Sequence, residues 1–405
     1  MYLMISHIPI YVDGNLFYTD VSWQLDLHLA RDWLARSFGG LTLLAPSLPL
    51  GKADAQTLQL SRIGGGDGIK VVPSFDLRGR ARSFWLRERK VWLADVRREL
   101  SNAKVIHTSA SDVYRPLAFM AHREAVRSNV CTVLVGPDMD PHLTAPASIR
   151  GWGYCMVFDH FMQQAGRTAD LVLLKEGVVH ERYSQYGKNT KAFCHSMHSN
   201  RDVMGEAGLE RRLATLGSNR PLRAVYAGRF IARKGLRDAL SAIASARRLG
   251  ANVEFDLFGG GPEEESLRRQ VNQLGIAAYV RFRGVADYGK AFLAELSEFD
   301  LLLFLPNEED TPRMLFDAMS AGLPLLGSNI PFLIHRVKVD EMGVLVDIGD
   351  HAAAAEHLCR FCKEPEQLKA FSRSARSRGH FHAVEQWYQR RAEWTIQAVE
   401  RHALP

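Results

Sequence analysis

The second half of this 405-residue chain carries cationic residues and glycines at a spacing that suits an anionic ligand. Gly228 and Arg229 follow a strand-like run, and Lys234 and Gly235 open the next helix-like stretch. A helix N-terminus favours anions because its first backbone N–H groups are unpaired and carry partial positive charge. A guanidinium and an ammonium beside it could therefore hold a diphosphate. Surface charges at the start of a helix would explain the same residues.

Two further motifs follow in the same half. The run Phe258-Gly259-Gly260-Gly261-Pro262 places glycines at a strand end, where a ligand can approach the backbone, although a tight structural turn explains them equally well. Glu309 lies in the loop before a helix expected over residues 312–321, and Asp317 lies eight residues later within that helix. Two acceptors so placed could bind sugar hydroxyls at the two ends of one elongated ligand.

The elements that position these residues alternate regularly. Short apolar runs are separated by amphipathic stretches in both halves, which predicts parallel sheets covered by helices on both faces. We expect an N-terminal domain, a linker region, a C-terminal domain and a final helix packing back on the N-terminal domain, over residues 1–200, 201–221, 222–380 and 381–405. Parallel sheets bind ligands at the carboxyl ends of their strands, so the ligand is expected in a cleft between the domains.

Composition excludes several classes of protein. Hydrophobic residues make up 46% and charged residues 24%, which is ordinary for a folded globular chain. The apolar runs are far shorter than the ~20 residues of a membrane-spanning helix. The N-terminus has no basic region or cleavage site, so a cytoplasmic location is predicted. The five cysteines do not form a disulfide framework, and neither Cys359-x-x-Cys362 nor the group Cys194, His195 and His198 completes a zinc site. No metal is predicted.

Positive charge is concentrated in one segment. Residues 78–99 carry eight Arg or Lys against three acids, a local net charge of +5, together with Trp85 and Trp92. Such a segment can bind an anionic membrane surface or a nucleic acid. A solvated helix face with its aromatic residues in the core is an equally good interpretation. No nucleic-acid-binding motif accompanies the segment, so no nucleic-acid partner is predicted.

The order and spacing of the three motifs resemble the C-terminal domain of the retaining glycosyltransferases of family 4, the glycosyl transferases group 1. Their α/β fold, GT-B, consists of two doubly wound Rossmann-like domains facing across a cleft. The resemblance is close over residues 222–350 and architectural over the first half. It implies that Arg229 and Lys234 hold the donor diphosphate, that Glu309 contacts the donor sugar and that Asp317, where the family has Glu, holds the ribose. The remaining residues expected at the nucleotide sugar are Gly14, Gly228, Gly260, Thr311, Pro312, Arg313, Met314 and Leu315.

Two features of the first half resemble the family less closely. Gly14, in Asp13-Gly14-Asn15, is the candidate for a glycine-rich loop after the first strand, with one glycine where two are usual. His107-Thr108-Ser109 stands where the family has His-x-His, so Ser109 replaces the histidine usually placed near the reacting carbon. His107 is thus a candidate catalytic residue. A histidine satisfied at a strand end is the commoner alternative.

The resemblance implies a metal-independent retaining hexosyltransferase without a cofactor, which moves sugar from a UDP- or GDP-sugar to a glycan acceptor in bacterial polysaccharide synthesis. The basic, Trp-bearing segment motivates a lipid-linked acceptor and a peripheral position on the inner face of the cytoplasmic membrane. Two alternatives stay open. One is another GT-B enzyme such as a nucleotide-sugar epimerase, and the other is a non-catalytic nucleotide-sugar-binding or partner-docking protein.

Overall fold

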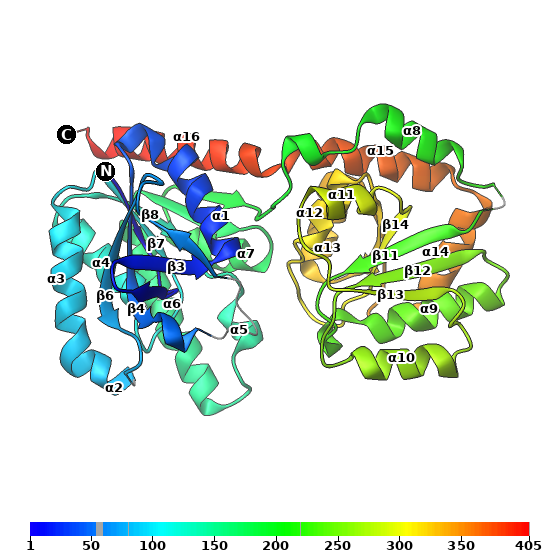
Figure 1. Cartoon of the computed structure of the whole chain (residues 1–405), viewed down its shortest axis with the longest axis horizontal. Coiled ribbons are helices and arrows are strands. Elements are labelled where there is room, and N and C mark those ends of the chain that lie inside the picture. Colours follow the sequence, from blue (N-terminus) through cyan, green and yellow to red (C-terminus); the bar gives the residue numbers. More distant parts are fainter. Residues whose placement is uncertain (54–59, 80, 219, 405) are drawn as a thin grey trace. The chain divides into compact units, whose positions relative to one another are not determined.

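The computed structural model describes residues 1–404 except 54–59, 80 and 219. The chain divides into two compact units (Figure 1). The first comprises Met1–Cys194 and Tyr388–Pro405, and the second comprises His195–Trp387. The expected linker region, apart from residue 219, falls within the second unit, and most of the final helix falls within the first.

The first unit contains a ten-stranded sheet. Its parallel part has the order β10-β9-β8-β7-β1-β4, with β6 paired to β4 and the hairpin β2–β3 leading to β5 at the far edge. The order reverses between β1 and β7, which makes this sheet doubly wound. The strands are β1 (Tyr2–Ile5), β2 (Ile10–Asp13), β3 (Leu16–Asp20), β4 (Leu41–Pro49), β5 (Leu60–Ile63), β6 (Ile69–Asp76), β7 (Val105–Ser109), β8 (Cys131–Val135), β9 (Leu171–Lys175) and β10 (Thr190–Phe193).

Helices cover this sheet. Helix α16 lies beside α1, where the Tyr388 hydroxyl donates to the backbone oxygen of Asp26 at 3.4 Å. The helices of the unit are α1 (Val21–Leu29), α2 (Ala81–Ser83), α3 (Arg89–Leu100), α4 (Leu117–Arg127), α5 (Pro141–Thr144), α6 (Ile149–Thr168), α7 (Val178–Tyr183) and α16 (Val384–His402), with a π-helical turn η4 (Phe84–Glu88).

The second unit contains a six-stranded parallel sheet in the order β13-β12-β11-β14-β15-β16. Its strands are β11 (Leu222–Ala227), β12 (Val253–Phe258), β13 (Val280–Gly284), β14 (Leu301–Phe304), β15 (Leu325–Ser328) and β16 (Gly343–Val346). Strand β14 is buried along its whole length, as expected of a strand covered on both faces. The doubly wound architecture predicted from the alternating pattern is therefore confirmed in each unit.

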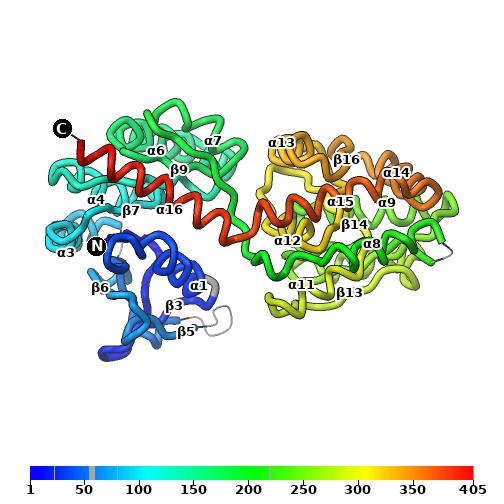
Figure 2. The backbone as a smooth tube through the Cα atoms, turned by 90° about the horizontal axis from the view of Figure 1, so that it is seen from above, coloured from blue at the N-terminus to red at the C-terminus, as the bar shows by residue number. Residues whose placement is uncertain are grey.

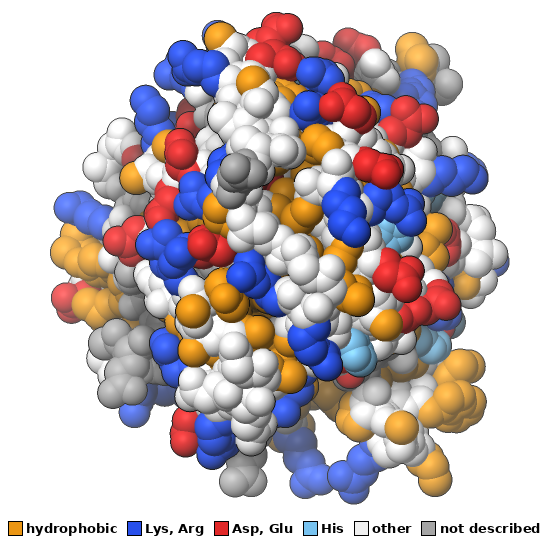
Figure 3. All heavy atoms as spheres, turned by 90° about the vertical axis from the view of Figure 1, so that its right-hand side faces the viewer, with side chains coloured by type: hydrophobic (Ala, Val, Ile, Leu, Met, Phe, Trp, Pro, Cys, Tyr) orange, Lys and Arg blue, Asp and Glu red, His pale blue; other side chains and the backbone are white. Residues whose placement is uncertain are grey.

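Helices lie on both faces of this second sheet. Helices α9 and α10 lie on one face in Figure 1, and α15 packs beside α8 and α12 on the other (Figure 2). The helices are α8 (Glu206–Ala214), α9 (Leu236–Arg248), α10 (Glu264–Gln273), α11 (Lys290–Leu296), α12 (Met314–Ser320), α13 (Pro331–Asp340), α14 (His351–Lys363) and α15 (Glu366–Phe381). The space-filling view of Figure 3 shows acidic and basic side chains interspersed over the face turned toward the viewer.

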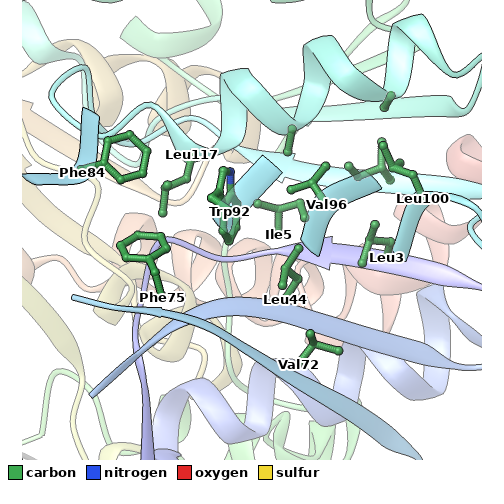
Figure 4. Close-up of a cluster of buried hydrophobic side chains, with 13 residues drawn as sticks. Leu3, Ile5, Leu44, Val72, Phe75, Phe84, Trp92, Val96, Leu100 and Leu117 are labelled. Atoms are coloured by element: carbon green, nitrogen blue, oxygen red, sulfur yellow. The ribbon is translucent and has the colours of Figure 1, made fainter. Parts of the chain in front are cut away.

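The basic segment 78–99 contributes to the core of the first unit. Trp92 on α3 is fully buried and packs against Phe75, whose ring centroid lies 6.1 Å away (Figure 4). Val96 and Leu100 follow it on the same helical face and are also buried. Trp85 is 47% exposed. The core interpretation therefore holds for Trp92, and only Trp85 remains at the surface.

Within the part of the chain that the structure describes, none of the helices has the length and apolarity that crossing a bilayer requires.

Candidate active site

The strand order of the second unit reverses between β11 and β14, and the loops after these two strands meet there. Such a switch point is where doubly wound sheets bind ligands. The backbone N–H of Asn307 in the second loop donates to the carbonyl of Arg233 in the first at 3.0 Å. Gly235 has φ +66, and a Cβ there would lie 1.5 Å from the carbonyl oxygen of Leu305. Only glycine allows the two loops to approach this closely.

Three cations converge on the loop after β11. Arg229 is exposed, and no described residue forms an ion pair with its guanidinium. The Lys234 ammonium pairs with Asp310, and the Arg233 guanidinium lies 3.1 Å from the same carboxylate. Burial lowers the pKa of Lys234, and Asp310 opposes this effect. Because Asp310 pairs with two of the three cations and carries a single negative charge, the cluster keeps a net positive charge that an anionic ligand can neutralise.

Sequence reasoning found Arg229 and Lys234 but missed Arg233 and Asp310. Asp310 is only 5% exposed and comes from a loop 76 residues away from Lys234 in the chain. Its position directly after Glu309 was the available signal, but nothing in the spacing indicates which carboxylate faces the lysine.

Backbone packing explains two of the three glycines after β12 but not the third. A Cβ on Gly259 would lie 1.9 Å from the carbonyl oxygen of Gly228, and one on Gly261 would lie 2.6 Å from that of Phe230. The nearest atom to a Cβ on Gly260 is 3.5 Å away, an ordinary contact. Backbone packing therefore requires Gly259 and Gly261, whereas Gly260 stays the candidate for ligand approach.

The side chain of Glu309, the first predicted carboxylate, contacts the N-terminus of α13. It is half-buried, and its oxygens accept from the Phe332 backbone N–H at 3.2 and 3.5 Å. This contact holds a negative charge at a helix N-terminus, an electrostatically favourable position. The carboxylate is thereby fixed in the loop that follows β14. The next residue in the sequence is Asp310, which pairs with Arg233 and Lys234.

The second predicted carboxylate, Asp317, lies inside the unit. It is 5% exposed, and it accepts a hydrogen bond from the Tyr288 hydroxyl at 2.9 Å. The Nδ1 atom of His198 lies 3.9 Å from it. Burial raises the pKa of Asp317 to about 7, and Tyr288 and Arg313 oppose this shift. Tyr288 thus covers the carboxylate that the resemblance assigns to the ribose.

The remaining residues expected at the nucleotide sugar differ in accessibility. Helix α12 begins at Met314, two residues later than the sequence predicted. Arg313 is exposed, and Thr311 and Met314 are half-buried. Pro312 and Leu315 are buried, and the Leu315 N–H already donates to the Pro312 carbonyl at 3.2 Å. The side chain of Arg313 is therefore the most accessible of this group.

In the first unit, the candidate catalytic His107 is buried. Its imidazole is 4% exposed, and its Nδ1 lies 2.8 Å from the Tyr2 hydroxyl. Ser109 Oγ lies 3.5 Å from the Nε2 atom. Burial, with a smaller contribution from Arg391, lowers the pKa of His107 to about 3. This arrangement favours a histidine satisfied inside the sheet, and a catalytic role for it stays a prediction.

Gly14 lies in a setting different from the one that the resemblance implied. It occupies the turn of the β2–β3 hairpin with φ +56, where Asp13 pairs with Leu16. The glycine is needed for a two-residue turn, and the loop directly after β1 contains Ser6, His7 and Ile8 instead. The signal was present in the sequence, since Gly14 and Asn15 separate two short apolar runs, a pattern typical of a two-residue hairpin.

His7 is a candidate residue that sequence reasoning missed. It is exposed directly after β1, at the switch point of the first sheet, where Ile5 is in register with Thr108 of β7. The surrounding protein lowers its pKa, while the carboxylates of Asp138 and Asp112 oppose this shift. Its place immediately after the first strand was the signal in the sequence.

One group of potential metal ligands occurs among the described residues. Cys131, Asp170 and His402 place ligand atoms within 4.8 Å of one another. His402 Nδ1 lies 2.9 Å from Asp170, and its Nε2 lies 3.2 Å from the Asn129 carbonyl oxygen. Hydrogen bonds within the protein thus already satisfy this histidine, and they join the end of α16 to the sheet. The absence of a metal stays a prediction.

Acid sensitivity is expected from the buried His107. Because its folded-state pKa is about 3 against an ordinary 6.5, the unfolded chain takes up a proton first, and stability is lost as pH falls from 6.5 toward 3. We expect His107→Gln, which keeps a partner for Tyr2, to reduce the loss of unfolding free energy between neutral and mildly acidic pH. Urea unfolding measures this, with the exposed His351→Gln as the control. Equal pH dependence in the parent and His107→Gln would contradict it.

Two doubly wound, largely parallel sheets in one chain, the second with a cationic cluster at its switch point, are the elements of the GT-B fold. Residues 214–378 match the family Glycosyl transferases group 1. The resemblance inferred from the motifs is confirmed for this region, which contains the cationic cluster and both carboxylates.

Solved structures with the same fold cover nearly the whole chain at low identity. The structure of Anabaena Alr3699/HepE in complex with UDP has a TM-score of 0.67 and 14% identity, covering 98% of this chain and 99% of that one. The structure of WaaG, a glycosyltransferase involved in lipopolysaccharide biosynthesis, has a TM-score of 0.57 and 13% identity, covering 97% and 99%. These similarities show the fold.

Curated relatives match over shorter regions. The lipopolysaccharide core biosynthesis glycosyltransferase LpsE of Rhizobium meliloti is 28% identical over 160 residues, 40% of this chain and 44% of its own length. The putative colanic acid biosynthesis glycosyltransferase WcaL of Escherichia coli is 28% identical over 190 residues, 44% of this chain and 46% of its own length. The alignments thus span less than half of either relative.

Proposed function

We propose that this chain is a retaining glycosyltransferase of family 4 that moves a sugar from a nucleotide diphosphate sugar to a glycan acceptor. The observation that carries the proposal is the cluster of Arg229, Arg233 and Lys234 at the switch point of the second sheet, within the region that matches the glycosyltransferase family. A guanidinium that is exposed and has no ion-pair partner among the described residues, beside a partly neutralised lysine, suits a diphosphate.

In this reaction the cations act on the leaving group. Negative charge develops on the diphosphate as the bond to the sugar breaks, and preorganised cations stabilise it without a metal ion. Arg229 would bind it directly, while Asp310 holds Lys234 and Arg233 in place. Glu309, fixed at the N-terminus of α13, would accept hydrogen bonds from the sugar hydroxyls. The acceptor hydroxyl would attack the anomeric carbon from the face that the diphosphate leaves, and an oxygen of the leaving diphosphate would take up its proton, so that the configuration is retained.

The donor is proposed to be a UDP-sugar, with a GDP-sugar as the alternative. Support comes from structures of the same fold in complex with UDP. The acceptor is proposed to be lipid-linked and used in bacterial polysaccharide synthesis, as the names of LpsE and WcaL suggest for those relatives. Such an acceptor would bring the enzyme to the inner face of the cytoplasmic membrane.

A second candidate is a non-catalytic nucleotide-sugar-binding protein. The burial of His107 and the covering of Asp317 by Tyr288 favour it, because both residues stand where the family's active site is expected. Binding alone does not separate the two candidates, but turnover does.

Donor binding and donor cleavage test the proposal together. A panel of UDP-, GDP- and ADP-sugars should include one that raises the melting temperature, since a ligand at 100 times its Kd stabilises by ~2.7 kcal/mol. That sugar nucleotide should then be cleaved with release of the nucleoside diphosphate. Stabilisation without cleavage, with and without glycan acceptors, favours the binding protein. The absence of any stabilisation overturns both candidates.

A further inference from the structure

The carboxyl edge of the first sheet carries polar residues that the proposed donor site does not use. The loops after β1 and β7 follow neighbouring strands, since Ile5 is in register with Thr108. These loops contain His7 and Asp112, and Asp138 lies in the loop after β8, the next strand of the sheet. Ligands of doubly wound sheets bind at this edge.

The imidazole of His7 lies near two carboxylates. The surrounding protein lowers the pKa of His7, while Asp138 and Asp112 oppose this shift, so both carboxylates act on the ring. His7 and Asp138 are exposed, and Asp112 is half-buried. The Asp138 carboxylate lies 2.8 Å from the Lys175 ammonium. Imidazole and carboxylate groups can therefore exchange hydrogen bonds with the hydroxyl groups of a ligand at this edge.

The carboxylate of Asp112 is held in place by its own loop. One oxygen accepts from the Tyr114 backbone N–H at 2.9 Å, and the other accepts from the Arg115 N–H at 3.3 Å. The Arg115 guanidinium is used elsewhere, since it donates to the carbonyl of Gly79. Each carboxylate oxygen keeps a lone pair for a further donor. Because the carboxylate is already oriented, binding a ligand hydroxyl there costs little conformational entropy.

Two tyrosine rings lie beside Asp112. Tyr114 is 58% exposed, and its ring centre lies 5.7 Å from that of Tyr154 on α6. The Tyr154 hydroxyl donates to the Ser111 carbonyl at 3.4 Å. Burial raises the pKa of Tyr154, and the charge of Asp112 adds to this shift. Tyr114 therefore presents an accessible aromatic ring next to the hydrogen-bonding groups of the edge.

We infer that these three loops bind a neutral sugar. Its ring packs on Tyr114, and its hydroxyl groups form hydrogen bonds with Asp112, Asp138 and His7. The negative face of an aromatic ring attracts the C–H groups on the face of a sugar, and a few fixed polar groups orient the ligand. Lys175 neutralises one of the two carboxylates, and the remaining negative charge disfavours an acidic sugar.

The inference rests on the proposed function only in identifying this sugar as part of the glycan acceptor. The residues that carry it all belong to the first unit, whereas the cationic cluster belongs to the second. Sugar binding and nucleotide binding can therefore be measured separately.

Saturation-transfer difference NMR on the whole chain tests the inference. The probes are the methyl α-pyranosides of glucose, galactose and mannose, with the methyl glycoside of glucuronic acid as the acidic probe. At least one neutral probe should bind, and more tightly than the acidic probe. Tyr114→Ala should raise the Kd of that neutral probe about fivefold, because an aromatic contact is lost. Asp112→Asn keeps an oxygen for the Tyr114 N–H but loses the charge, so it should raise the Kd about tenfold.

Trp152→Ala is the matched control. It removes a 66% exposed aromatic ring from α6, two residues before Tyr154 and therefore on a different side of the helix. Its Kd should equal that of the parent. His7→Ala, at an exposed position, is a further variant that should weaken binding about threefold, the effect of one neutral hydrogen bond.

Three results would overturn the inference: none of the neutral probes binds, the acidic probe binds as tightly as they do, or the Tyr114, Asp112 and His7 variants all bind like the parent. Calorimetric titration with UDP distinguishes these failures from failure of the proposed function. A parent that binds a neutral glycoside through Tyr114 but does not bind UDP keeps the sugar site and loses the glycosyltransferase. A parent that binds UDP but none of the glycosides loses the sugar site alone.

Discussion

Arg229→Ala is expected to weaken UDP binding by about 10- to 100-fold, because a hydrogen bond to a charged group contributes ~1.5–3 kcal/mol. Arg229 is exposed and has no ion-pair partner among the described residues, so its removal should leave the fold and the melting temperature unchanged. Isothermal titration calorimetry with UDP and with uridine measures the effect. Binding of uridine, which lacks the diphosphate, should be unaffected.

A single substitution of the neighbouring Lys234 would change the stability of the fold as well as UDP binding. Lys234→Ala removes a diphosphate contact, but it also leaves the buried Asp310 with Arg233 as its remaining cation. A buried carboxylate that loses a partner destabilises the fold. The double variant Lys234→Ala with Asp310→Asn removes both charges and should recover stability without recovering UDP affinity.

Arg237→Ala is the matched control for both variants. Arg237 is also an arginine near the start of α9, but it pairs with Glu263 at 2.9 Å. Its loss should not change UDP affinity. If Arg229→Ala and the double variant both bind UDP like the parent, the cations are only surface features, and the assignment of this region to the donor is wrong.

The second sheet shows which properties the sequence determines locally. Its strands are four to six residues long and mostly apolar, and they lie between amphipathic helices, so their alternation with helices and the glycines at the ends of β11 and β12 could be predicted from pattern alone. Gly235 is predicted at a helix start, whereas the reason that a glycine is required there, its close approach to the Leu305 carbonyl, is seen only in the structure.

Other features of the site depend on contacts between residues that are far apart in the sequence. The pattern of residue types along the chain does not show these contacts. The pairing of Asp310 with Lys234 and the hydrogen bond from Tyr288 to Asp317 join segments that are far apart in the sequence. Trp92 and Trp85 are seven residues apart in one basic segment, yet one is in the core and the other at the surface. Which of the two tryptophans is buried depends on how α3 packs against the sheet. The sequence of the segment alone does not determine this packing.

The two carboxylates of the loop and helix after β14 are expected to affect different kinetic constants. Glu309→Gln keeps an oxygen to accept from the Phe332 N–H but removes the charge, so the cap of α13 is retained. We expect kcat to fall about 100-fold, the usual size of a lost transition-state interaction, with little change in the Kd of UDP. The neighbouring, exposed Glu308→Gln is the control. A parent-like kcat in Glu309→Gln would exclude a contact with the sugar in the transition state.

Asp317→Asn is expected to raise the donor KM rather than lower kcat, because a ribose contact acts in the ground state and the transition state alike. The Tyr288 hydroxyl donates to Asp317, so a contact between Asp317 and the ribose requires Tyr288 to move away, or the ribose to bind the Tyr288 hydroxyl instead.

Since burial raises the pKa of Asp317 to about 7, the carboxylate forms as pH rises through 7. The parent's donor KM should fall over that range, and the Asp317→Asn variant should lose this dependence. The Kd of UDP should also rise in Asp317→Asn and in Tyr288→Phe, and both increases should shrink with 2′-deoxyUDP, which lacks a ribose hydroxyl. If Asp317→Glu and Tyr288→Phe leave the affinities for UDP and its deoxy analogue unchanged, the carboxylate holds Tyr288 in the fold and does not recognise the ribose.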